Sequence, residues 1–247
     1  MSLRVLPILF QDADLVVVSK PAGLLVHRSM IASDASEFAM QIVRDQIGSR
    51  VYPVHRLDRP TSGALVFALS SEVARALSEE FSSRRVGKKY LAVVRGVAPE
   101  DTLIDYPLRE ELDPTTDSQA REFKDPQPAV TRVRRLAVKE LPIQVDRYPT
   151  SRYSLVEACP ETGRKHQIRR HLRHLGHPIV GDVTHGVGKH NRFFATNYEI
   201  RRLMLACTEI SFKHPRSGGE LVVKAPLAED FSRLLREFGW RDHVPRS

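Results

Sequence analysis

Hydrophobic and polar positions alternate along much of the chain in a pattern that is typical of β-strands. Two apolar runs, residues 3–10 and 15–19, flank the polar stretch 11–14, and this arrangement predicts two paired strands joined by a turn. Later runs are also rich in β-branched residues, which favour strands. They predict strands at residues 90–95, 129–138 and 153–159, and a hairpin formed by residues 203–212 and 220–224.

Other segments space their apolar residues three or four apart, which predicts helices. Residues 34–48 form one such segment, in which Asp34 and Glu37 fit a capping box and Gly48 marks the end. Residues from about 72 to 85 form a second such segment, with cations at its end that suit the negative end of a helix dipole. Those cations are Arg84, Arg85, Lys88 and Lys89. Two further helices are predicted, one at residues 163–175 that ends at Gly176 and one around residues 231–238 that ends at Gly239.

The order of these elements predicts the fold class. Strands and helices mix without regular βαβ alternation, which favours an α+β fold whose central sheet is mixed but mostly antiparallel and is flanked by helices and loops. Residues 97–128 contain five prolines and predict a long surface excursion with short strands. No repeat or separate RNA-binding module precedes the main pattern, so a single domain is expected over residues 1–247.

Composition narrows the class of partner. Lysine and arginine exceed aspartate and glutamate by 38 − 30 = 8, and this positive net charge makes a polyanionic partner a fair expectation. Hydrophobic residues make up 41% of the chain. Cys159 and Cys207 lie in apolar runs and are expected to be core thiols in a reducing compartment. No signal peptide or run of about 18 apolar residues is present, so we expect a cytoplasmic protein without a membrane partner.

A short polar stretch, His55–Gly63, carries the first candidate for chemistry. Asp58 lies between Arg56 and Arg59, and flanking cations keep a carboxylate ionised, which suits a nucleophile better than a proton donor. Turn-forming residues after it predict a loop just before the apolar run 64–69. Taken alone, such a run is more often a surface salt-bridge cluster than a catalytic site.

The densest basic stretch, residues 163–177, predicts a helix whose exposed faces carry cations suited to a phosphate backbone. Arg169, Arg173 and the histidines are expected on these faces. A metal site is disfavoured because the four histidines at 166, 171, 174 and 177 cannot converge on one face. Residues 186–189 lack the spacing of a phosphate loop, and no nucleophile elbow of a serine hydrolase occurs.

Five motifs, in order, resemble those of the RluA family of pseudouridine synthases, over roughly residues 3–226. Further short matches resemble the family's tRNA-modifying members, whereas His185 departs from a tyrosine that many relatives carry. The five motifs are Lys20–His27, His55–Gly63, Lys89–Tyr90 leading into Val94–Gly96, Thr162–Arg169, and Gly176–Asp182, and the further matches are Leu25–Ser29, Pro126–Thr131, Arg147–Tyr153 and Phe238–Arg241.

The resemblance implies a pseudouridine synthase fold and the isomerisation of uridine to pseudouridine in RNA without a cofactor or metal. It implies that Asp58 is the nucleophile, that Tyr90 lies over the uracil, and that Arg169 pairs with Asp58. Covalent attack on the sugar, attack on the base and assistance in removing the sugar 2′ hydrogen all remain open for the carboxylate.

The resemblance also implies a set of RNA contacts. Arg56 is expected to enter the RNA stack as the target base leaves it. By resemblance, the partner is tRNA and the target is uridine 65; a monomer without a nucleotide cofactor is expected. A ribosomal RNA synthase and a non-catalytic RNA-binding or ribosome-assembly factor are the alternatives. The predicted RNA-binding residues are Arg56, His55, Arg164, Lys165, His166 and Arg173.

Overall fold

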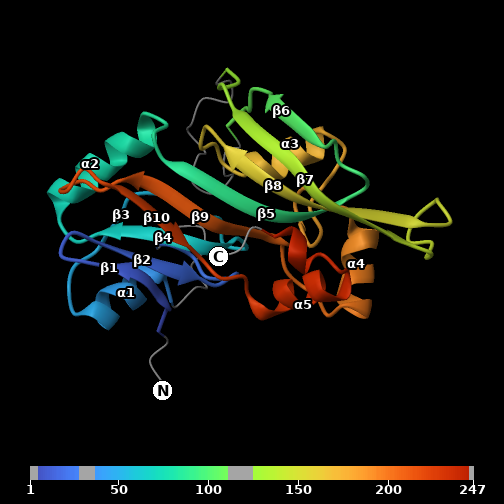
Figure 1. Ribbon diagram of the computed structural model, residues 1–247, viewed down its shortest axis with the longest axis horizontal. Coiled ribbons are helices and arrows are strands. Elements are labelled where there is room, and N and C mark those ends of the chain that lie inside the picture. Colours follow the sequence, from blue (N-terminus) through green and yellow to red (C-terminus); the bar gives the residue numbers. More distant parts are fainter. Residues whose placement is uncertain (1–4, 28–36, 111–124, 245–247) are drawn as a thin grey trace, which may run out of the picture. The chain divides into compact units, whose positions relative to one another are not determined.

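The computed structural model describes residues 5–27, 37–110 and 125–244 (Figure 1). The chain divides into two compact units, each assembled from segments that are far apart in the sequence. The expectation of a single domain over residues 1–247 stays a prediction. The first unit contains Met1–Lys88, Arg109–Pro126 and Cys207–Pro226, and the second contains Lys89–Leu108, Gln127–Ala206 and Leu227–Ser247.

A β-sheet forms the core of the first unit. Its strands follow the order β1-β2-β4-β9, with β10 paired to β9 and β3 paired to β4. The pairs β1–β2, β2–β4, β3–β4 and β9–β10 are antiparallel, so both predicted hairpins are confirmed. The strands are β1 (Ile8–Gln11), β2 (Leu15–Lys20), β3 (Tyr52–Pro53), β4 (Ser62–Ala68), β9 (Leu205–Lys213, whose first two residues belong to the second unit) and β10 (Glu220–Lys224).

Helix α1 (Ala39–Ile47) begins later than the sequence predicts. Phe38 is its N-cap and makes no side-chain cap, so the helix does not start at the predicted capping box; Asp34 itself lies outside the described residues. The end is as predicted, because Gly48 adopts the left-handed conformation at φ 66°. Burial of Ile42 and Val43 fixes the helix on its unit, and tertiary packing rather than capping therefore decides where it forms.

Helix α2 (Ser71–Ser82) begins with a side-chain cap, in which the Ser70 hydroxyl accepts a hydrogen bond from the Val73 N–H at 3.2 Å. The helix ends three residues before the predicted Arg85, so its last turn holds no basic residue; the favourable effect of the following cations on the helix dipole stays a prediction. Arg84 and Arg85 lie beyond the helix, and Lys88 and Lys89 belong to the next strand.

The second unit is built on four strands in the order β5-β8-β7-β6, and each neighbouring pair is antiparallel. Together with the first unit this confirms the predicted α+β class with a mostly antiparallel sheet. Helix α3 (Gln167–His174) lies against β8. The strands are β5 (Gly87–Arg95, whose first two residues belong to the first unit), β6 (Asp101–Asp105), β7 (Val130–Leu141) and β8 (Ser151–Pro160).

Two helices of the second unit, α4 (Gly188–Asn197) and α5 (Glu229–Glu237), lie side by side (Figure 1). Phe194 of α4 meets Phe238, just after α5, with ring centroids 6.1 Å apart, and Phe238 in turn packs against Trp240. The sequence predicts α5 and its end near Gly239, but it does not predict α4 or the short 3-10 helix Arg241–His243.

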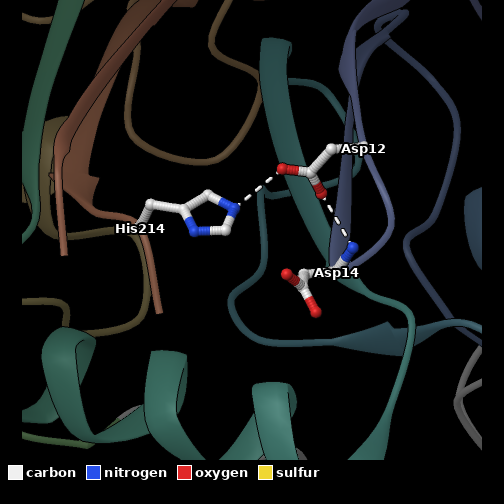
Figure 2. A group of neighbouring side chains, drawn as sticks. All are labelled: Asp12, Asp14 and His214. Carbon is white, nitrogen blue, oxygen red and sulfur yellow. Dashed lines mark hydrogen bonds and ion pairs between the residues drawn. The ribbon is translucent and has the colours of Figure 1, made fainter. Parts of the chain in front are cut away.

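A polar cluster joins the β1–β2 turn to the β9–β10 hairpin within the first unit (Figure 2). Among the described residues, Asp12, Asp14 and His214 offer three ligand atoms within 4.8 Å of one another. Asp12 instead accepts from His214 Nε2 at 2.7 Å and from the backbone N–H groups of Asp14 and Leu15. Arg216 holds the Asp14 carboxylate with both Nε and Nη2. These charged hydrogen bonds connect the two turns, which explains why Asp12, Asp14 and His214 lie together.

The described part of the chain contains no helix with the length and apolarity that a membrane span requires. Of the two cysteines, Cys207 is buried as expected, whereas Cys159 is partly exposed, so the prediction of two core thiols is wrong for Cys159.

The close approach of β4 to β9 gives a prediction about stability. A Cβ at Gly63 would lie 2.0 Å from the Cys207 carbonyl oxygen, and the backbone there has φ 118°. Gly48 has φ 66° but nothing within 4 Å. We expect Gly63→Ala to lower the free energy of unfolding by about 3 kcal/mol and Gly48→Ala by about 1 kcal/mol, measured by urea denaturation. Equal losses in the two variants would contradict the close packing of these strands.

Candidate active site

Asp58 lies on the loop between β3 and β4, directly before the turn that leads into β4. Its side chain is partly exposed, whereas the neighbouring Leu57 is 4% exposed and anchors the loop to the core. The Thr61 N–H donates to the Asp58 carbonyl at 3.0 Å and closes the turn. The predicted loop is therefore confirmed, and it carries a partly exposed Asp58 on a backbone that the turn holds in place.

The loop is held by Lys20, the last residue of β2. The Lys20 side chain is fully buried. Its ammonium group donates to the carbonyl oxygens of Pro21 at 2.9 Å, Leu24 at 2.8 Å and Arg59 at 3.3 Å. The Gly23 N–H also donates to the Arg59 carbonyl at 2.8 Å. Lys20 and Gly23 together tie the segment 20–24 to the residue that follows Asp58.

His55, predicted to bind RNA, has an internal role in this loop. Its ring stacks on Phe81 with centroids 4.7 Å apart, and its Nε2 accepts the Val66 N–H at 3.0 Å. Desolvation by burial, with a smaller contribution from Lys88, lowers the pKa of His55 to about 3. An accepting Nε2 and a low pKa both mean a neutral ring. A contact of His55 with RNA stays a prediction and would involve an uncharged group.

Arg56 and Arg59 are exposed on either side of Asp58. Exposure is what the predicted entry of Arg56 into an RNA stack requires, and that role stays a prediction. Arg59 donates from Nε to the Gly23 carbonyl at 3.2 Å, so it also contributes to holding the loop.

Tyr90 belongs to the second unit, in β5, where it pairs with Ala158 of β8. Its side chain is 8% exposed, so the ring has a fixed place in the sheet. The predicted strand is confirmed, and the stacking of Tyr90 on uracil stays a prediction.

Arg169 also belongs to the second unit, on α3, and it is buried rather than on an exposed helix face as the sequence predicts. Its Nε and Nη2 donate to the two carboxylate oxygens of Asp182 at 2.7 and 2.8 Å. Burial alone would raise the pKa of Asp182, but the hydrogen bonds from Arg169 and from the His185 N–H outweigh it and lower that pKa. The sequence gives Asp182 no such role. Pairing of Arg169 with Asp58 stays a prediction.

The start of α3 is fixed by Gln167, and the helix therefore begins four residues later than the sequence predicts. The Thr162 hydroxyl donates to Gln167 Oε1 at 2.7 Å, and Gln167 Nε2 donates to Val130 O and Thr131 Oγ1 at 2.9 Å each. His166, just before the helix, has φ 56°. Residues 163–166 form a loop of basic residues ahead of the helix.

The histidines of this stretch have separate partners. His166 Nδ1 lies 3.0 Å from His185 Nε2, whereas His171 Nδ1 lies 3.0 Å from Thr131 Oγ1. His177 Nδ1 contacts the Arg95 carbonyl at 2.9 Å, and His174 stacks on Tyr106. His171 is fully buried, so its predicted place on an exposed face is wrong.

The remaining predicted RNA-binding residues differ in exposure. Lys165 and Arg173 are exposed, whereas Arg164 and His166 are partly exposed. Arg164 uses its Nε to hold the Pro128 carbonyl at 3.3 Å, which orients the loop before α3. Their contacts with RNA stay predictions.

The sequence matches a family of known proteins. The family model described as RNA pseudouridylate synthase matches residues 14–174, a range that includes Asp58, Tyr90 and Arg169. A protein of Vibrio cholerae serotype O1 named tRNA pseudouridine synthase C is 52% identical over 97% of this chain and 98% of its own length. A protein of the same name from Salmonella typhi is 51% identical over 97% of this chain and 92% of its own length.

Among solved structures, the human RNA pseudouridylate synthase domain containing 4 protein resembles this chain with a TM-score of 0.69 and 27% identity. The match covers 94% of this chain and 93% of that one. The predicted pseudouridine synthase fold is confirmed.

The neutral state of His55 gives a prediction about pH. The unfolded chain takes up a proton near the ordinary pKa of 6.5, but the folded chain does so only near 3, so protonation favours unfolding as the pH falls below 6.5. We expect the His55 ring to stay neutral at pH 5 in an NMR titration. We also expect the free energy of unfolding to fall less steeply below pH 6.5 in His55→Gln, by up to about 1.4 kcal/mol per pH unit. Titration of the His55 ring near pH 6.5 would contradict the assignment.

Proposed function

The chain belongs to the RNA pseudouridylate synthase family, which isomerises uridine to pseudouridine in RNA, and on that premise we propose that its substrate is tRNA. The observation that carries the proposal is similarity along nearly the full length to proteins named tRNA pseudouridine synthase C. The predicted target, uridine 65, and the predicted monomer and cytoplasmic location form part of the same proposal. A ribosomal RNA target is the alternative, and no observation on this chain favours it.

The isomerisation of uridine requires a carboxylate in a fixed position more than it requires a proton donor. The bond between N1 of uracil and C1′ of ribose breaks, the base turns, and a bond forms between C5 and C1′. The C5 proton leaves to solvent and N1 takes up a proton, so the product is an isomer of uridine. In our proposal Asp58 supplies the carboxylate, either by covalent attack or by assisting removal of the 2′ hydrogen. Its partly exposed position on a loop anchored by Lys20 and Leu57 supports this role.

In the same proposal, Tyr90 binds the uracil base and Arg169 stabilises the negative charge of the carboxylate. Tyr90 offers a ring with a fixed place in the sheet, on which a base taken out of the RNA helix can stack. Arg169 offers a guanidinium whose orientation is set by two hydrogen bonds to Asp182. A fixed cation favours the ionised form of a neighbouring carboxylate, which is the form that a nucleophile needs.

The role of Asp58 can be tested in tRNA labelled with tritium at C5 of uridine. We expect Asp58→Asn to abolish tritium release, because the amide cannot replace the carboxylate as nucleophile or base. Its affinity for tRNA should stay within about tenfold of the parent, since the carboxylate makes no phosphate contact. Asp45→Asn, an exposed change on α1, is the matched control and should keep full turnover. Turnover in Asp58→Asn would refute its role.

The target is tested by mapping pseudouridines in RNA. In a strain that lacks this protein, we expect one tRNA site, position 65, to lose its pseudouridine, and expression of the parent chain but not of Asp58→Asn to restore it. The measurement is sequencing of total RNA after chemical labelling of pseudouridine. Loss of a ribosomal RNA site with intact tRNA would replace tRNA by the alternative substrate.

A further inference from the structure

An exposed aromatic stack lies beside the basic helix α3 of the second unit. Tyr106, directly after β6, stacks on His174, the last residue of α3, with ring centroids 3.7 Å apart and an angle of 17° between the planes. Tyr106 is 43% exposed, and His174 is exposed as well. Neither residue is in the predicted set of catalytic and RNA-binding residues, and an exposed tyrosine gains little from the hydrophobic effect.

The backbone of Tyr106 is fixed although its ring is exposed. Its N–H donates to the Ala129 carbonyl at 3.1 Å, and its carbonyl oxygen lies 3.0 Å from Nε2 of the buried His171. Because a carbonyl oxygen only accepts, His171 carries its proton on Nε2 and donates to Tyr106. The other ring nitrogen, Nδ1, lies 3.0 Å from Thr131 Oγ1. The backbone of Tyr106 is therefore held by two hydrogen bonds, and its ring is held by stacking on His174.

Cations line the helix next to this stack. Helix α3 contains no acidic residue, and Arg170 lies one turn before His174, on the same face of the helix. Arg173 is exposed and follows in the same turn. Asp105 is the acidic neighbour of Tyr106 in sequence. Arg170 is partly exposed. An exposed aromatic stack next to a helix that carries arginines is a combination with which proteins bind unpaired nucleotides.

We propose that the Tyr106–His174 stack is a platform for an unpaired base of the RNA substrate, with Arg170 and Arg173 contacting the adjacent phosphates. This rests on the proposed function, because it takes RNA as the ligand. The site differs from that of the reacting uridine, which is assigned to Asp58 and Tyr90. The platform extends RNA recognition to the end of α3, where the predicted set contains Arg173 alone.

The structural alternative is that Tyr106 merely covers the end of α3, and three substitutions separate the two roles. Tyr106→Phe keeps the aromatic face, Tyr106→Leu keeps an apolar cover without one, and Tyr106→Ala removes both. The measurement is the Kd for a tRNA transcript that the parent enzyme modifies, at one salt concentration. We expect Tyr106→Phe to stay within twofold of the parent, and the other two variants to bind about tenfold more weakly.

Salt dependence separates stacking from charge. Tyr106→Leu should shift the plot of log K against log salt concentration without changing its slope, because no phosphate contact is lost. Arg173→Ala should reduce the slope by about one. Tyr148→Ala is the matched control, because Tyr148 is 50% exposed and its ring centroid lies 4.7 Å from Cζ of Arg147, but it belongs to another loop. Loss of the Tyr148 ring should leave Kd unchanged.

The outcomes are distinct. Parent-like binding by Tyr106→Leu would overturn the platform, and so would weak binding by Tyr106→Phe; the Tm of each variant shows whether folding is retained. In either case a parent enzyme that modifies the transcript leaves the proposed function in place. If the parent modifies no tRNA transcript, the proposed function itself fails.

Discussion

The buried ammonium group of Lys20 is the constraint on which the loop of the candidate nucleophile depends. A buried charge costs several kcal/mol unless hydrogen bonds replace its water, and the carbonyls of Pro21, Leu24 and Arg59 supply them. Because Arg59 directly follows Asp58, the bonds that solvate the ammonium also fix the backbone that carries the carboxylate. The charge and the loop thus stabilise each other, and Asp58 is held in place without being buried.

The same principle organises the second unit, where Arg169 is buried against Asp182. A buried ion pair is a weak source of net stability, since desolvation offsets much of the attraction, but removal of either partner leaves an uncompensated charge. The pair therefore fixes geometry more than it adds free energy. Gln167 acts in the same way at the start of α3, where a side-chain amide with four hydrogen-bond partners sets the first residue of the helix.

Sequence patterns predict both hairpins, the strands β5, β7 and β8, and the ends of α1 and α5, because alternation, helical spacing and glycine positions are local properties. They predict no strand at β3 or β4. They miss α4, whose described buried residues are only His190 and Phe194 and whose first residue is a glycine. They also place Arg169 and His171 on the surface. Burial of such groups depends on partners distant in sequence: Asp182 follows Arg169 by thirteen residues, and Thr131 precedes His171 by forty. No local pattern contains these partners.

Net charge is a poor guide to where RNA binds, because paired and buried cations do not act at a distance. Arg216 is held by Asp14, and Arg202 by Asp230, through close hydrogen bonds. Within α3, Arg169 is internal, and burial lowers the pKa of His171, which keeps it neutral. The positive charge that α3 presents to solvent is consequently carried by Arg170, which is partly exposed, and Arg173, which is exposed. In our proposal, recognition of RNA therefore depends on the position of a few cations beside aromatic rings rather than on the number of basic residues.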